Sequence, residues 1–260
     1  MIRTLHSMRT VVLLLLCTIG ISHAHAQETE NKSYHFNGHW SATNNGFSFI
    51  PTFSLGKPAT IVNLNVGGDR FTWEPQFRFD LDGFRPWSII GFWRYKIVNN
   101  ETFMVRVGTQ LPAYAFHYES ATSGTTTYTK IVAQRFLPFD FTTNWTLTDK
   151  VTLSVFYLTS FGVEKADQLE RANFVSVQAF ISKVKISDKI EFAWNPQVYY
   201  LGIDGLEGYY TAHSFTLKHA DIPVDISSTI NKAFTSELNA KNFDWNVSLG
   251  YTFGGTFTKQ

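Results

Sequence analysis

A histidine and a serine two residues apart are the first candidates for chemistry in this chain. In His39-x-Ser41 both side chains would share one face of a β-strand, because side chains alternate with period two. A histidine beside a serine can accept the hydroxyl proton and make the serine a nucleophile for acyl transfer. The pair therefore predicts a possible acyl hydrolase, although His-x-Ser also arises by chance.

Two further pairs could activate a water molecule between acids and a histidine: Asp80-x-Asp82 and His219-x-Asp221. The strand order given below puts them at opposite ends of a sheet, so they cannot share a water molecule. The sequence has no Walker loop, no glycine-rich nucleotide motif and no Cys/His metal cluster. We expect neither a cofactor nor a metal site.

A strictly alternating stretch, FTWEPQFRFDLD at 71–82, carries ionisable residues between aromatic ones. The apolar set is Phe71, Trp73, Phe77 and Phe79, and the polar set is Glu74, Gln76, Arg78 and Asp80. Period two predicts a strand with one apolar and one polar face. In a soluble sheet the apolar face forms the core, whereas in a membrane barrel it faces lipid and the polar face lines the lumen.

The same alternation recurs along the chain and predicts twelve strands, within a range of ten to fourteen. They span approximately 47–55, 59–66, 71–82, 86–97, 102–119, 127–147, 151–163, 171–186, 190–203, 208–218, 223–234 and 243–253. Residues 27–46 form either an N-terminal arm or an extra strand, and 47–260 form the barrel. Parity changes at Leu111-Pro112 and at 135–138 predict bulges. At 223–238 a helix is the alternative, because apolar residues also recur at intervals of four.

Residues 1–26 have the pattern of a cleavable signal peptide. Arg3 and Arg9 precede an apolar run at 11–22, and an Ala-x-Ala pattern ends at Ala26. Of 22 Lys and Arg against 21 Asp and Glu, cleavage removes only these two arginines, so the balance near zero gives no hint of nucleic acid. The single cysteine, Cys17, also leaves, so no disulfide framework is expected. Beyond this segment no apolar run approaches the roughly 18 residues that a spanning helix needs.

Tryptophan placement and the last strand favour the membrane interpretation. Five tryptophans lie near the ends of predicted strands, where a membrane interface holds indoles: Trp73, Trp87, Trp145, Trp194 and Trp245. Residues 243–253 alternate Phe-x-Trp-x-Val-x-Leu-x-Tyr-x-Phe, which resembles the C-terminal strand of bacterial outer-membrane β-barrels; here GGTFTKQ follows Phe253. The resemblance implies an all-β, antiparallel transmembrane β-barrel, with outer-membrane lipid and the barrel-assembly machinery as partners. It implies no activity.

With both termini on the periplasmic side, the three longest connections would be external, as such barrels prefer. The residues expected to line the lumen are Glu74, Arg78, Asp80, Arg94, Lys96, Arg106, Glu119 and Glu191. These charges either pair with one another in a sealed interior or line a passage for solutes. Twelve strands lie between the filled interior of about eight strands and the open channel of about sixteen.

The sequence therefore predicts an outer-membrane barrel of a Gram-negative bacterium, either a narrow, porin-like passive channel for small solutes or a structural barrel. One alternative is an acyl hydrolase using His39 and Ser41. It is similar to outer-membrane phospholipase A in its His-x-Ser pair and strand number, but that family's Asn-Gly after the serine is not matched directly. The other alternative is a secreted soluble β-barrel or sandwich that binds a ligand. The residues favour a barrel without catalytic chemistry.

Overall fold

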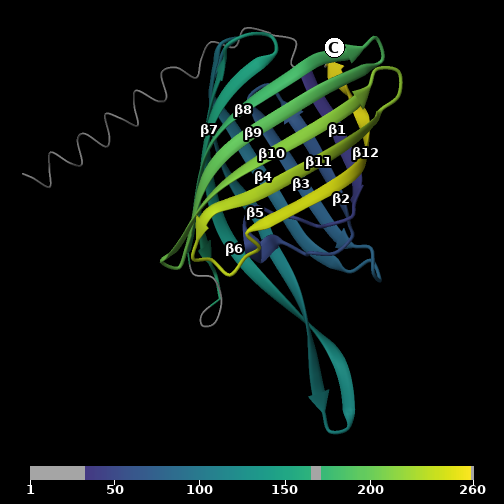
Figure 1. Ribbon diagram of the computed structural model, residues 1–260, viewed down its shortest axis with the longest axis vertical. Helices are drawn as coiled ribbons and strands as arrows, with labels where there is room; N and C mark the ends of the chain where they lie inside the picture. Colours follow the sequence, from purple (N-terminus) through teal and green to yellow (C-terminus); the bar gives the residue numbers. More distant parts are fainter. Residues whose placement is uncertain (1–32, 165–170, 259–260) are drawn as a thin grey trace, which may run out of the picture. The chain divides into compact units, whose positions relative to one another are not determined.

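The computed structural model describes residues 33–164 and 171–258. The predicted signal peptide at 1–26 lies outside these residues. Residues 34–257 form one compact unit, and of the other unit only Ser33 and Thr258 are described. In the barrel unit, twelve strands close in chain order, with β1 between β2 and β12 (Figure 1). The predicted all-β antiparallel barrel of twelve strands is confirmed.

The strands cover most of the described chain. They are β1 (Ser33–Thr43), β2 (Ala59–Gly68), β3 (Phe71–Asp80), β4 (Pro86–Asn99), β5 (Phe103–Ser123), β6 (Thr126–Thr146), β7 (Val151–Gly162), β8 (Arg171–Ser187), β9 (Ile190–Ile203), β10 (Leu206–His219), β11 (Val224–Ser236) and β12 (Phe243–Thr258). A short 3-10 helix, η1 (Pro51–Phe53), lies between β1 and β2. None of the described residues belong to a helix long and apolar enough to cross a membrane.

The predicted strand at 47–55 is wrong, whereas the later strands lie close to their predicted bounds. Residues 47–55 form bends and η1, and the first strand is β1, within the segment predicted as an arm or an extra strand. The alternation of Asn37, His39 and Ser41 with apolar or small residues was the signal for it. The bulge predicted at Leu111-Pro112 is present, as a register shift between Thr109 and Tyr114.

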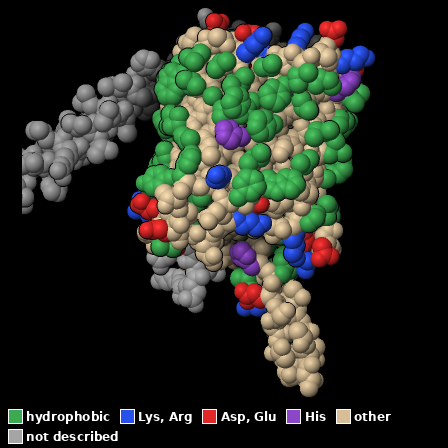
Figure 2. All heavy atoms as spheres, in the orientation of Figure 1, with side chains coloured by type: hydrophobic (Ala, Val, Ile, Leu, Met, Phe, Trp, Pro, Cys, Tyr) green, Lys and Arg blue, Asp and Glu red, His purple; other side chains and the backbone are tan. Residues whose placement is uncertain are grey.

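Apolar side chains face outward and polar side chains face inward, as predicted for residues 71–82. Phe71 and Trp73 are 50% and 36% exposed, whereas Ser88, Ser154 and Ser176 are almost fully buried. Figure 2 shows hydrophobic side chains spread over the outer face of the barrel, with charged side chains gathered toward its two ends. This distribution is the reverse of a soluble protein and is typical of a barrel in lipid.

The strands β5 and β6 continue past the closed sheet as a two-stranded hairpin (Figure 1). Pairing of β5 with β4 stops at Ala115, and pairing of β6 with β7 stops at Phe136. The two strands pair with each other as far as Ser123 and Thr126. We call this side of the barrel the hairpin end, and the opposite side, where β1 begins and β12 finishes, the terminal end.

Gly91 in β4 leaves no room for a side chain beside the β5 bulge. A Cβ atom there would lie 2.6 Å from the Leu111 carbonyl oxygen and 3.1 Å from Pro112 Cδ. Because the oxygen belongs to the backbone, it cannot move aside without disturbing the β4–β5 pairing. We expect Gly91→Val to destabilise the barrel by about 1–3 kcal/mol or more.

Heat-modifiable migration on a detergent gel measures this effect as a lower temperature at which the folded band disappears. Gly255→Val is the matched control, since a Cβ at this β12 position would have nothing within 4 Å. Equal transition temperatures for the two variants would contradict the close approach of β4 and β5.

Candidate functional site: the barrel lumen

The connection between β1 and β2, residues 44–58, folds into the barrel, and we call it the inner segment. The ring centroid of Phe49 lies 5.4 Å from that of Tyr199 and 6.3 Å from that of Phe174. The ring of Phe53 lies 5.1 Å from that of Phe136, on β6. Phe136, Phe174 and Tyr199 are all buried, because their side chains point into the barrel. The inner segment therefore crosses the interior from β8 and β9 toward β6.

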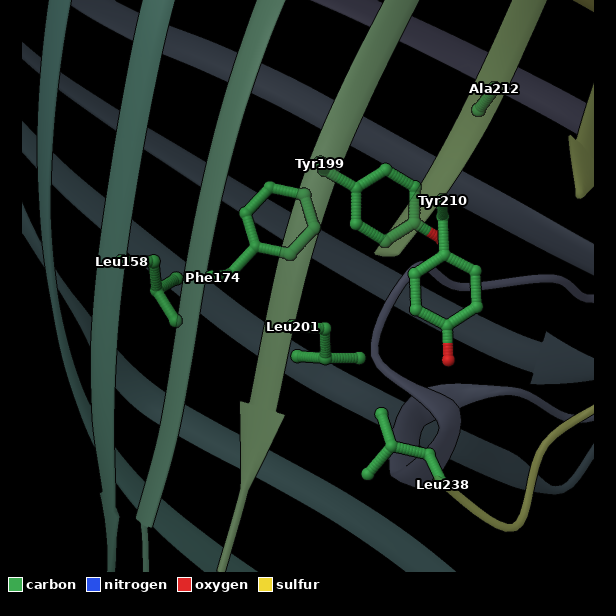
Figure 3. Packing of buried hydrophobic residues seen from close by; sticks show 7 residues of the cluster. All are labelled: Leu158, Phe174, Tyr199, Leu201, Tyr210, Ala212 and Leu238. Carbon is green, nitrogen blue, oxygen red and sulfur yellow. The ribbon is translucent and has the colours of Figure 1, made fainter. Parts of the chain in front are cut away.

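An apolar cluster on the inner wall receives this segment (Figure 3). Its buried members are Leu158, Phe174, Tyr199, Leu201, Tyr210, Ala212 and Leu238. Tyr199 and Tyr210 stack with centroids 4.8 Å apart. Their hydroxyls are satisfied, since Tyr199 Oη donates to Asn231 Oδ1 at 2.8 Å and Tyr210 Oη lies 2.6 Å from Ser236 Oγ. This cluster was not predicted from the sequence, although Tyr199 and Leu201 interrupt the polar face of β9 at inward positions.

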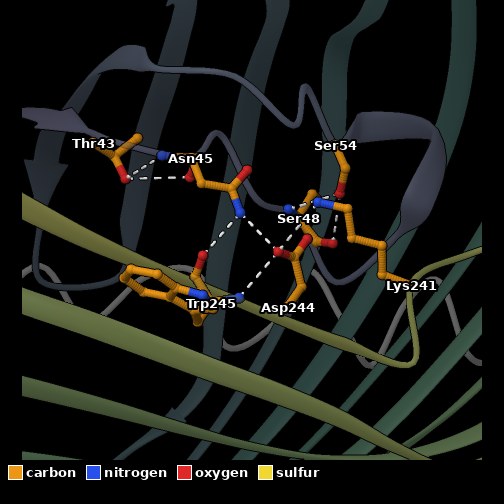
Figure 4. Close-up of polar contacts among 7 residues, drawn as sticks. All are labelled: Thr43, Asn45, Ser48, Ser54, Lys241, Asp244 and Trp245. Carbon is orange, nitrogen blue, oxygen red and sulfur yellow. Dashed lines mark hydrogen bonds and ion pairs between the residues drawn. The ribbon is translucent and has the colours of Figure 1, made fainter.

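The inner segment is fastened to β12 by the Asn45 side chain (Figure 4). Asn45 Nδ2 donates to Asp244 Oδ1 at 2.7 Å and to the Trp245 carbonyl at 2.8 Å. The two limbs of the segment meet where Gly46 N donates to the Lys57 carbonyl at 2.7 Å. The segment is thus a loop with a closed neck, held at the seam where β12 meets β1.

Charged residues of β3 to β6 form a connected group on the inner wall. Arg94 forms an ion pair with Glu74, and its Nε lies 3.9 Å from Asp140 Oδ1. Arg106 reaches across to β6, where its Nη2 donates to Thr142 Oγ1 at 3.5 Å. Charges of opposite sign are therefore adjacent, as in a wall whose ions neutralise one another.

Three other residues predicted to line the lumen are buried or partly buried. Asp80 is buried and accepts from Arg85 Nε at 3.0 Å. Lys96 is partly buried on β4. Glu191 is partly buried on β9, opposite Lys218 of β10.

Glu119 does not line the lumen, contrary to expectation. It is exposed and lies opposite Lys130 in the two-stranded hairpin. Strand parity alone placed it inside, but β5 has left the closed sheet at this point. A residue beyond the last barrel pairing belongs to a two-stranded ribbon, which has no luminal face.

Trp87 also departs from its predicted place at the membrane interface. It is 3% exposed, and the Arg78 guanidinium carbon lies 5.0 Å from the centre of its ring. A register shift between Arg78 and Phe79 in the β3–β4 pairing interrupts the alternation here, so Trp87 lies inside.

The remaining predicted interface tryptophans lie on the outer face. Trp73, Trp145 and Trp245 are 36%, 39% and 48% exposed. Trp194 stacks on Phe215 with centroids 6.4 Å apart. Trp40 and Trp93, which were not among the predicted interface residues, are also exposed on this face. Their positions remain a prediction of membrane contact.

The candidate hydrolytic residues are not assembled for catalysis. His39 Nε2 lies 2.9 Å from Asp225 Oδ2. Ser41 is buried, and no hydrogen bond joins it to His39 among the described side chains. Within the described ranges, no group of three or more His, Cys, Asp or Glu could hold a metal ion.

The lumen contains polar space at the terminal end and beside the inner segment. A cavity of about 690 Å³ is lined by β1 to β4 and by β10 to β12, and Glu74, Arg94, Lys218 and Asp225 face it. A second cavity of about 460 Å³ lies between the inner segment and the wall around Tyr199 and Tyr210. Polar groups from opposite walls thus share a common interior.

The sequence matches no protein-family model, and no curated protein matches it either. The structure is similar to the KdgM porin, with 9% identity and a TM-score of 0.50 over 84% of this chain and 99% of that chain. It is similar to an outer membrane channel from Pseudomonas putida F1, with 10% identity and a TM-score of 0.50 over 89% of this chain and 98% of that chain. Identities this low carry the fold alone, and the fold is that of the bacterial outer-membrane β-barrels.

Proposed function

We propose that this protein is a narrow passive channel of the bacterial outer membrane, constricted by its inner segment. The observation that carries the proposal is the cavity of about 690 Å³, which polar side chains from opposite walls line inside an apolar exterior. A water-accessible interior within a lipid-facing wall is what passive conduction requires.

Membrane insertion is part of the proposal. A closed sheet leaves no unpaired edge, so the backbone is satisfied without water. The predicted signal peptide at 1–26 would export the chain, and the strand at 243–253 would be read by the assembly machinery. The terminal end would then face the periplasm and the hairpin end the exterior.

The charges in the lumen favour small polar solutes without a strong preference for one sign. Arg94 forms an ion pair with Glu74, and Asp225 adds a negative charge to the cavity. Lys218 adds a further positive charge to the same cavity. A lining of mixed sign neither concentrates nor repels one class of ion strongly.

Conductance in planar bilayers tests the proposal. The purified, refolded protein should give small, steady conductance steps, below those of open porins with sixteen strands, because the inner segment narrows the lumen. A refolded protein that shows heat-modifiable migration and yet gives no conductance would refute the channel.

A further inference from the structure

A small third cavity lies beneath the inner segment, apart from the polar space described above. Its volume is about 170 Å³. Phe49, Ile50 and Phe53 of the inner segment cover it, and Ile90, Phe156 and Leu158 form much of its wall. The polar side chains that face it include Arg78, Gln110 and Ser160. The cavity is therefore apolar on most sides with one cationic group.

The guanidinium of Arg78 has no ion pair with any acid among residues 33–164 and 171–258. Its Nε and Nη1 atoms are buried and make no hydrogen bond among the described residues. The neighbouring acids on β3 are engaged elsewhere, since Asp80 pairs with Arg85 at 3.0 Å and Glu74 pairs with Arg94. Trp87 covers one face of the group. A buried charge without a counterion is costly, and an anion at this place would relieve that cost.

We propose that this cavity binds a small amphiphilic carboxylate, with the carboxylate on Arg78 and a single-ring or short aliphatic body between the inner segment and the wall. The planar fork of an arginine matches a carboxylate in two parallel hydrogen bonds. An apolar protein cavity of about 150 Å³ admits benzene, so the volume here suits one ring.

An inorganic anion alone or a neutral ring alone would match only part of the cavity. An inorganic anion would satisfy Arg78 but leave the apolar walls unfilled, whereas a neutral ring would fill the walls but leave the charge uncompensated. As a statement about the solutes that pass, the inference rests on the proposed channel function. Binding of the carboxylate at Arg78 does not depend on conduction, so the binding site and the channel can be refuted separately.

Calorimetric titration of the full-length protein in non-ionic detergent at pH 7 tests the site, with empty micelles as the blank. Benzoate should bind with one-to-one stoichiometry and about tenfold or more tighter than either benzyl alcohol or formate, because only benzoate offers both the ring and the charge. Arg78→Gln should weaken benzoate binding about tenfold or more and leave benzyl alcohol unchanged.

Arg171→Gln is the matched control, because Arg171 is exposed and its guanidinium lies over the Phe161 ring. It should leave benzoate affinity as it is. Ser160→Leu, which fills the cavity from β7, should abolish benzoate binding while Arg78 is intact.

Equal affinity for benzyl alcohol or for formate would overturn the proposal, as would equal losses in the Arg78 and Arg171 variants or no benzoate binding at all. If Arg78→Gln does not fold, the affinities of the unmodified protein for the three ligands, together with benzoate binding by Ser160→Leu, still test the proposal. A protein that conducts without binding benzoate refutes this site only, and one that binds benzoate without conducting refutes the channel only.

Discussion

Deleting residues 47–56 and joining Gly46 to Lys57 is expected to raise the single-channel conductance roughly tenfold, because the obstruction of the lumen is removed. The join is short, since Gly46 N already donates to the Lys57 carbonyl at 2.7 Å. The deletion removes Phe49 and Phe53, which pack on the inner wall at β8, β9 and β6, and leaves the Asn45 contacts with β12 in place.

The projecting hairpin provides the control for this deletion. Replacing residues 119–130 by Asn-Gly joins Tyr118 to Ile131, which are paired in the sheet. These residues lie beyond the closed barrel, so the conductance should stay at the unmodified level. If both deletions fold and conduct alike, the inner segment is not the constriction.

Glu74→Gln and Arg94→Gln are expected to shift ion selectivity in opposite directions. Loss of Glu74 leaves Arg94 and Lys218 facing the large cavity and favours anions. Loss of Arg94 leaves Glu74 without its ion-pair partner and removes one positive charge beside Asp140, which favours cations. The ratio of chloride to potassium permeability should change about threefold or more in each case, since charged side chains at a narrow point set selectivity.

The reversal potential in a gradient of KCl measures both changes. The double variant, with both residues replaced by Gln, removes one charge of each sign and should return close to the unmodified selectivity. Shifts of the same sign in both single variants would contradict a role of this ion pair in the conducting path.

Much of the wall could be predicted because a strand's pattern is local. Phe71 and Trp73 on one side and Glu74 on the other fix which face of β3 is apolar, whatever the partner strand is. The same reasoning failed for residues 47–55, whose alternating aromatic residues resemble a strand. Those side chains pack against β6, β8 and β9 instead, and no local pattern names such distant partners.

The candidate site shows the same division. The sequence placed Glu74, Arg94 and Arg106 inside, and the ion pair of Glu74 with Arg94 follows from their positions on adjacent strands. It placed Trp87 at the interface because this residue lies near the end of a strand, but a bulge turns the side chain inward. It placed Glu119 in the lumen because parity was carried past the end of the barrel. The alternation of side chains predicts which face a residue occupies only where the pairing between neighbouring strands is uninterrupted.

The sequence by itself determined the all-β class and the apolar and polar faces of single strands, since both follow from spacing along one strand. The number twelve was correct although the predicted strand at 47–55 was wrong, because β1 takes its place in the count. Only the tertiary structure decided that the inner segment enters the lumen and that Nε and Nη1 of Arg78, beneath it, form no hydrogen bond with the described residues. Those two features depend on contacts between residues far apart in the chain, such as Phe49 with Tyr199, which exist only after the barrel has closed.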